Sequence, residues 1–180
     1  WLADERDDLA VGRILDAAGE LFAANGVAAV GMAEIAVAAG CSRATLYRYF
    51  ANRHVLRTAF VHREARRLGA IVAAKVAKID DPRRRLEVAV LAAVAGVRAD
   101  PTLAVWFAED SVGTTGGMAA ASEVVQTLAL SFLGDSRNRS ALDAARWVVR
   151  AVVSLLAVPG ADAAEERRLV RHFLVPSVLP

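Results

Sequence analysis

The sequence predicts an all-α protein built from a three-helix head, residues 1–52, and a larger all-helical domain, residues 53–180. Apolar residues recur at three- and four-residue steps along most of the chain, which is the period of a helix with one buried face. No stretch alternates apolar and polar residues for long enough to predict a strand. Hydrophobic residues make up 56% of the 180 residues, which indicates extra apolar surface in a subunit interface or around a cavity.

Two glycines divide the head into three helices. The first helix is expected at residues 7–24, and Gly26 follows it in a position that tolerates a left-handed backbone. A second, short helix is expected at residues 32–39, stopped by Gly40, and a serine then caps a third at residues 43–50. Two short helices joined by a three-residue connection that contains glycine form the sequence pattern of a helix-turn-helix.

Prolines and polar capping residues divide the rest of the chain into six helices. These are expected at about residues 53–77, 82–98, 101–109, 118–133, 141–158 and 163–174. Residues 111–117 carry three glycines and are expected to form a flexible loop.

Charge is distributed unevenly around the helix-turn-helix. The formal net charge is only +2, but residues 43–67 carry seven arginines and one glutamate, whereas residues 1–42 carry two arginines and seven acidic residues. A basic cluster beside an acidic stretch is the electrostatic footprint expected of a nucleic-acid contact. A solvated helix face would give the same pattern, so charge alone does not decide between the two.

The third helix of the head carries the side chains expected to contact DNA. Ile35, Leu46 and Phe50 are assigned to the small core beneath it, together with Leu21 and Phe22 of the first helix. That assignment leaves an exposed set on the same helix: Arg43, Ala44, Thr45, Tyr47, Arg48 and Tyr49. Arginine can bond N7 and O6 of guanine in the major groove, and hydroxyl groups contact phosphates. For the two tyrosines, ordinary aromatic packing is the alternative.

Residues at fixed spacing through the head carry a family resemblance. They are Phe22 with Gly26, Ile35-Ala36, Ala39-Gly40, Ser42, Thr45-Leu46-Tyr47, Tyr49-Phe50, Arg53 and Leu56. In these positions the chain resembles the TetR family of bacterial transcription regulators, over roughly residues 7–57. The resemblance implies a DNA-binding head, a fourth helix that links it to a helical ligand-binding and dimerisation domain, and a homodimer formed mainly by the last two helices.

The resemblance also implies roles for individual residues. Four would face the major groove and three would contact the DNA backbone: Arg43, Ala44, Thr45 and Arg48 in the first group, and Tyr47, Tyr49 and Arg53 in the second. Val30 and Gly31 stand where the family usually has Thr or Ser, so a hydroxyl contact to phosphate is expected to be lost there.

The helix expected at residues 141–158 is apolar on more than one face, which predicts burial on two sides. One side would pack on its own domain, and the other would pair with a second subunit in a four-helix bundle that includes residues 163–174. A fully buried central helix in a monomer is the alternative. Five bulky apolar residues would suit either a pocket for a hydrophobic effector or plain core packing: Trp106, Phe107, Met118, Phe132 and Trp147.

These features favour a sequence-specific transcription regulator, a repressor released from a pseudo-palindromic operator by a small hydrophobic effector. The alternative is a helical protein that binds or sequesters a small molecule and keeps a vestigial DNA-binding head. An enzyme, a cofactor or a metal site is not expected, since the sequence has no phosphate loop, nucleophile motif or metal-ligand spacing. A lone cysteine, Cys41, and apolar runs too short for a membrane span fit a cytoplasmic protein.

Overall fold

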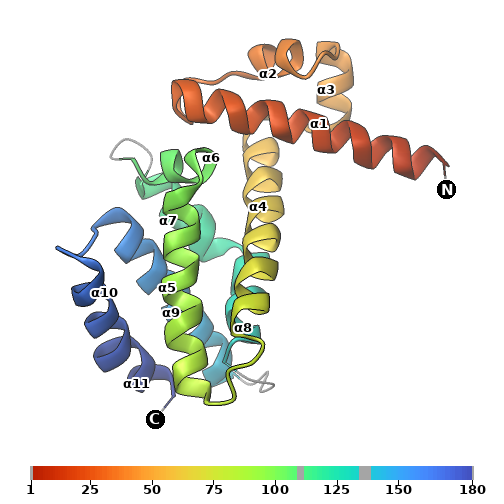
Figure 1. The fold of residues 1–180 in the computed structure, drawn as a ribbon. Coiled ribbons are helices and arrows are strands. Elements are labelled where there is room, and N and C mark those ends of the chain that lie inside the picture. The colour runs from red at the N-terminus through yellow and green to blue at the C-terminus, as the bar shows by residue number, and fades with distance from the viewer. Residues whose placement is uncertain (1, 109–111, 134–138, 180) are drawn as a thin grey trace.

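The computed structural model describes residues 2–108, 112–133 and 139–179, and the regular elements in these ranges are all helical, as expected. The head and the connecting helix comprise α1 (Leu2–Asn25), α2 (Met32–Ala38), α3 (Arg43–Tyr49) and α4 (Arg53–Val76). The bundle comprises α5 (Pro82–Ala99), α6 (Pro101–Ala104), the 3-10 turn η1 (Val105–Phe107), α7 (Val112–Ala121), α8 (Glu123–Ser131), α9 (Arg139–Ala157), α10 (Ala163–Leu169), the π-helical turn η2 (Val170–Leu174) and α11 (Val175–Val178). Figure 1 shows α1 lying across one end of the molecule, with α4 running from the head into the bundle.

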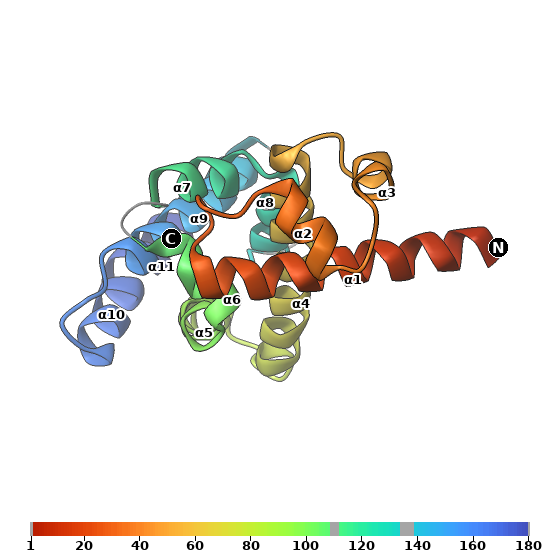
Figure 2. The same ribbon diagram turned by 90° about the horizontal axis from the view of Figure 1, so that it is seen from above.

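The turns of the head follow from its glycines. Gly26 and Gly40 have φ angles of +82° and +64°, which L side chains rarely adopt, so each lets the chain turn sharply after a helix. The backbone N–H of Gly31 donates to the Glu34 carboxylate at 2.8 Å, which satisfies an otherwise free donor at the start of α2. Seen from above, α3 lies to one side of α1 (Figure 2). The expected helix-turn-helix is thus present at the expected residues.

A buried cluster unites the head with the first half of α4 and with η1. Its most enclosed large side chains are Phe22, Ile35, Leu46, Leu56, Phe60 and Trp106. A Cβ at Gly19 would lie 2.8 Å from Cε2 of Phe60, so only glycine lets α1 approach α4 this closely. The core expected beneath α3 is confirmed for Phe22, Ile35, Leu46 and Phe50, which are all buried, whereas Leu21 is half-buried and packs against the cluster.

Four helices surround the interior of the bundle. α4 packs against α5 and α8, and α9 packs against the same two helices. A second buried cluster fills the space between α5, α9 and the C-terminal helices: Leu86, Val90, Val94, Val97, Val148, Leu155, Leu156, Val170, Leu174 and Val175. The bundle therefore places the inner faces of α4, α5, α8 and α9 opposite one another.

An ion pair fixes α10 to α5. Nη1 and Nη2 of Arg98 donate to the two carboxylate oxygens of Glu166 at 2.9 and 2.7 Å, and Nη2 also donates to the Leu155 carbonyl at 2.8 Å. The hydrogen bonds from Arg98 lower the pKa of Glu166, against the opposing effect of burial. The pair therefore holds the C-terminal helices against the bundle while Glu166 is ionised.

Some expected boundaries are wrong. The loop expected at residues 111–117 is helical from Val112, because Thr115 is buried against η1 and donates to the Trp106 carbonyl at 2.6 Å. The helix expected at residues 118–133 is interrupted at Ser122, whose Oγ accepts from the Val125 N–H at 3.2 Å and starts α8. Tertiary contacts here outweigh local propensity.

Two other expected helices differ from the structure near their C-terminal ends. The helix expected at 101–109 changes to a 3-10 turn at Val105, and residue 109 lies outside the described residues. The last helix continues through η2 and α11 to Val178, beyond its expected end at residue 174. Among the described residues, no single helix is both long and apolar enough to cross a membrane. The length and apolar composition of a membrane span are reached only by α5 taken together with α6 and η1, which are separated from α5 by a 96° bend.

Candidate nucleic-acid interface and ligand cavity

α3 presents a short basic and polar face to solvent. Of its six predicted contact residues, four are exposed and two are half-buried: Arg43, Ala44, Tyr47 and Arg48 in the first group, Thr45 and Tyr49 in the second. Leu46, on the opposite face of the helix, is fully buried. The helix therefore turns its predicted reading face outward, with one arginine in its first turn and one in its last.

The Thr45 hydroxyl is held at the start of α3. Ser42 Oγ accepts a hydrogen bond from the Thr45 backbone N–H at 3.0 Å, and the two hydroxyl oxygens lie 2.9 Å apart in a second hydrogen bond. These bonds cap the helix and fix the direction of its N-terminus. A helix N-terminus carries partial positive charge, so this geometry favours a phosphate nearby.

Tyr49 is engaged by residues of the head itself. Its hydroxyl donates to Asp7 Oδ1 at 2.6 Å and accepts from Nη2 of Arg48 at 2.8 Å. The Arg48 guanidinium also lies 4.8 Å from the centre of the Tyr49 ring. The acidic start of α1 thus lies against the last turn of α3, which a reading of α3 by itself did not predict.

Two arginines at the start of α4 hold the connection between α1 and α2. Nη1 of Arg53 donates to the carbonyls of Ala28 and Val30 at 3.1 and 3.5 Å, and Arg57 donates to the Val27 carbonyl. Burial lowers the pKa of Arg57, and the neighbouring charge of Arg53 lowers it further. Arg53, predicted to contact the DNA backbone, is exposed, but one of its nitrogens is committed to this connection.

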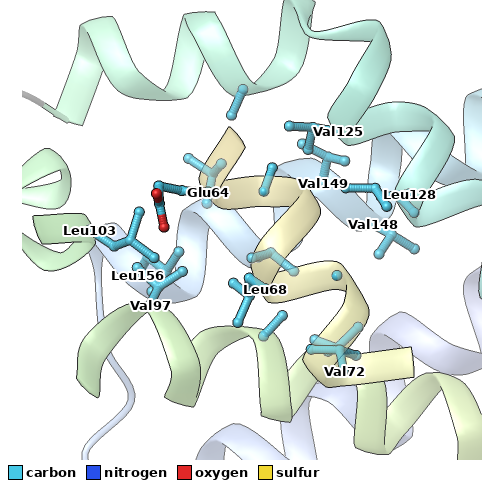
Figure 3. A pocket seen from close by; sticks show the side chains of 18 of the residues that line it. Glu64, Leu68, Val72, Val97, Leu103, Val125, Leu128, Val148, Val149 and Leu156 are labelled. Atoms are coloured by element: carbon cyan, nitrogen blue, oxygen red, sulfur yellow. The ribbon is translucent and has the colours of Figure 1, made fainter. Parts of the chain in front are cut away.

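Beneath the head, the bundle encloses an apolar cavity with a volume of about 200 Å³. Its wall is formed by inner faces of α4, α5, α8 and α9, and residues of η1 and α7 also line it. Figure 3 shows hydrocarbon side chains around it, with the Glu64 carboxylate on the α4 side near Leu103. The cavity therefore lies directly below the junction between head and bundle.

Three of the five predicted ligand-binding residues line this cavity: Trp106, Phe107 and Phe132. Met118 packs against the cluster of the head instead. Trp147 lies on the outer face of α9, where half of its surface is exposed and its Nε1 donates to Ser177 Oγ at 3.0 Å. The expected grouping of all five side chains is thus wrong for these last two, because the faces of α7 and α9 that carry them turn away from the cavity.

Glu64 is an acidic residue of the cavity wall that the sequence analysis did not predict. It is only 5% exposed, and both of its oxygens are bonded: Arg63 Nε donates to Oε1 at 2.9 Å and Arg67 Nε to Oε2 at 2.6 Å. A carboxylate that follows one arginine and precedes two more within three residues in a helix usually indicates a solvated face, so the sequence carried no clear signal. Within the described ranges, no three His, Cys, Asp or Glu side chains gather as metal ligands.

The partners of Glu64 connect the cavity wall to the head and to α6. Nη1 of Arg63 donates to the Gly12 carbonyl at 3.1 Å and to Asp16 Oδ1 at 2.8 Å, both on α1. Nη2 of Arg67 donates to Asp100, the N-cap of α6. Hydrogen bonds to Glu64 and Asp100 raise the pKa of Arg67. The buried Glu64 carboxylate is therefore linked to α1 through Arg63 and to the start of α6 through Arg67.

Three aromatic rings join the same elements. Phe22 of α1 meets Phe60 of α4 and Trp106 of η1 edge to face, with ring centroids 5.5 and 5.4 Å apart. Phe60 and Trp106 stack at 5.7 Å with planes 9° apart. Because Trp106 also lines the cavity, a single ring forms part of the cavity wall and part of the core of the head.

Comparison with known proteins agrees with this architecture. Residues 14–59 match the family model described as bacterial regulatory proteins, tetR family. An uncharacterized HTH-type transcriptional regulator of Mycobacterium tuberculosis strain H37Rv is 49% identical over 183 residues, covering 100% of this chain and 91% of that protein. The chain belongs to the TetR family of bacterial transcriptional regulators. Members of this family bind operator DNA and effectors and are generally dimers.

Solved structures of TetR regulators share the fold. The complex of RolR with resorcinol has a TM-score of 0.72 at 18% identity, covering 97% of this chain and 90% of that one. The repressor AlkX of Dietzia sp. strain DQ12-45-1b, implicated in biodegradation of n-alkanes, has a TM-score of 0.65 at 21% identity, covering 92% and 93%. The all-α fold with an N-terminal helix-turn-helix, predicted from the sequence, is confirmed.

Proposed function

We propose that this TetR regulator is a repressor that binds a pseudo-palindromic operator as a homodimer and releases it when a small hydrophobic molecule enters the cavity. Residues 1–52 act as the DNA-binding domain and residues 53–180 as the effector-binding and dimerisation domain. The observation that carries the proposal is the outward face of α3, with Arg43, Tyr47 and Arg48 exposed above a sealed core. Arg43 and Arg48 read bases together with Ala44 and Thr45, while Tyr47, Tyr49 and Arg53 contact phosphates.

The dimer places two copies of α3 in successive major grooves, about 34–36 Å apart or a multiple of that distance. Large apolar side chains exposed on α9, directly after it and on the C-terminal helices support this subunit interface: Leu142, Trp147, Val158, Leu169 and Phe173. Phe173 is 71% exposed, which is unusual for a phenylalanine in a single subunit.

The oligomeric state tests the interface. Phe173→Glu places a charge at its centre and should convert the dimer to a monomer in analytical ultracentrifugation. Ile71→Glu is the matched control, because Ile71 is also exposed, at 56%, but lies on α4. A wild-type monomer at micromolar concentration, or equal effects of the two variants, would contradict the proposed dimer.

Effector release is supported by the shared wall between the cavity and the head. Trp106 and Arg63, one of the two partners of Glu64, contact α1, so a molecule that shifts the cavity wall also shifts the surface on which α1 packs. The effector must bind the released state better than the DNA-bound state, and a tenfold preference corresponds to about 1.4 kcal/mol. RolR, which binds resorcinol, and AlkX show that bundles of this fold serve regulators linked to small organic molecules.

Mobility-shift titration against the DNA upstream of the chain's own gene tests the function. Tight binding to that fragment, weaker binding to a shuffled fragment and a steep fall with salt are expected for a regulator. If binding to the two fragments is equal, the alternative of a small-molecule sequestering protein with a vestigial head is favoured instead.

A further inference from the structure

The polar groups of the cavity wall determine what kind of molecule it accepts. Apart from Glu64 and Thr115, the described residues around it contribute hydrocarbon and aromatic side chains and glycine. The Thr115 hydroxyl donates to the Trp106 carbonyl, and both oxygens of Glu64 accept from arginines. The hydroxyl and carboxylate groups of the cavity wall are therefore already bonded within the protein.

A charged ligand of either sign would enter this space without a partner. An anion would meet the Glu64 carboxylate, while Arg63 and Arg67 point away to Asp16 and Asp100 on the outside of the cavity. A cation would have to share the Glu64 carboxylate with two guanidinium groups that already balance its charge. Burying a charge without a partner costs far more than apolar contact returns.

We propose that the effector of this cavity is an uncharged, hydrocarbon-like molecule, and that Glu64 excludes organic anions. This inference rests on the proposed effector-released function. The volume, about 200 Å³, is comparable to the roughly 150 Å³ apolar cavity that stays dry and takes up benzene. The Nε1 atom of Trp106 has no hydrogen-bond partner, but protein atoms enclose it, so the ligand contacts the ring and not this donor.

Three probes with the same alkyl chain separate uncharged from charged ligands: octane, octanoate and octylamine at neutral pH. Trp1→Phe and Trp147→Phe leave Trp106 as the only one of the three tryptophans, so its fluorescence reports occupancy of the cavity. Octane should bind at least about a hundredfold more tightly than either ion, because only the ions lose hydration without a partner. Octanoate or octylamine binding as tightly as octane would overturn the inference.

A variant tests the role of Glu64 directly. Glu64→Gln should strengthen octanoate binding about tenfold, since the nearest charges are then the two arginines, and should leave octane binding within about twofold. Glu87→Gln is the matched control, because Glu87 is 3% exposed and paired with Arg84 but does not line the cavity. An unchanged ratio of octane to octanoate affinity in Glu64→Gln would show that Glu64 does not exclude anions.

If Glu64→Gln does not fold, the probe series in the Trp1→Phe, Trp147→Phe protein still tests the inference. DNA binding of the wild-type protein distinguishes failure of the inference from failure of the proposed function. If octane does not bind while specific DNA binding persists, the inference about the cavity fails and the regulator remains. If octane binds while specific DNA binding is absent, the proposed function fails and the chemistry of the cavity remains.

Discussion

The head and the bundle use their side chains in opposite ways. The head seals its interior with Phe22, Ile35 and Leu46 and turns its arginines and tyrosines outward. The bundle leaves an apolar space inside and shields its one acidic wall residue with Arg63 and Arg67. A surface that reads DNA needs exposed hydrogen-bonding groups, whereas a cavity that takes an apolar molecule needs polar groups that are either bonded within the protein or enclosed away from the ligand. One chain meets both needs because the regions share only a narrow junction.

Loss of packing at the junction between head and bundle should have the largest effect on the free energy of unfolding. Phe60 is 1% exposed and contacts the rings of Phe22 and Trp106, so Phe60→Ala removes packing on both sides of the boundary. We expect a loss of about 3–5 kcal/mol in the free energy of unfolding, measured by urea denaturation. Val37→Ala, at a residue 81% exposed on α2, is the control and should change stability by no more than about 0.5 kcal/mol. A small loss in Phe60→Ala would mean that head and bundle are not packed as one unit.

Loss of the ion pair between Arg98 and Glu166 should have the next largest effect on the free energy of unfolding. Glu166→Gln keeps the shape of the side chain but removes its charge toward Arg98. We expect a loss of about 2 kcal/mol, because charge-assisted bonds contribute about 1.5–3 kcal/mol and the Arg98 side chain is 37% exposed, which weakens them.

The pH dependence of that loss gives a second measurement. The folded pKa of Glu166 lies below its usual 4.5, so its stabilisation is present above that pH and is lost as the pH falls through the folded value. Wild type should therefore approach the stability of Glu166→Gln on acidification. A difference between the two that stays constant down to the folded pKa and below would contradict the assignment.

Arg43→Ala tests the reading face of the head. Loss of a contact to guanine should weaken binding to the preferred sequence by about 1–3 kcal/mol and relax base preference at one position. Fluorescence anisotropy with single-base variants of the bound fragment measures both effects. Arg83→Ala at the start of α5 removes the same charge far from the head and serves as control (Figure 1). Equal losses on preferred and random DNA would show that Arg43 contacts only phosphate.

Much of the head was predictable because its signals are local. Gly40, Ser42 and the buried Leu46 lie within one short segment, and removing the expected core residues from α3 left six predicted contact residues, of which four are exposed and two half-buried. The bonds that occupy Tyr49 and Arg53 were not predictable, since their partners, Asp7 and the carbonyl of Ala28, are 42 and 25 residues away in the chain.

The bundle was less predictable because its site is built from distant segments. The burial of Glu64 depends on two long-range ion pairs of its arginine partners. Arg63 pairs with Asp16, 47 residues away in the chain, and Arg67 pairs with Asp100, 33 residues away. The outward direction of Trp147 depends on the rotation of α9, which its apolar pattern on several faces leaves open.

The contact between the acidic start of α1 and α3 should have the smallest effect. Asp7→Asn removes the charged acceptor of Tyr49 and a negative charge beside the phosphates. We expect DNA affinity to rise by about threefold, within the range of about 0–1 kcal/mol for surface charge contacts. Asp8→Asn removes the same charge one residue further along, so a smaller gain there would assign the effect to the Tyr49 bond. A loss of affinity in Asp7→Asn would mean that Asp7 instead positions Tyr49 for DNA.

The most direct test of the account joins the two regions in one measurement. The affinity for the upstream DNA fragment is determined by anisotropy with and without octane, while Trp106 fluorescence reports cavity occupancy in the same sample. The account predicts that filling the cavity weakens specific DNA binding by at least about tenfold, or about 1.4 kcal/mol. An unchanged DNA affinity with a fully occupied cavity would contradict it.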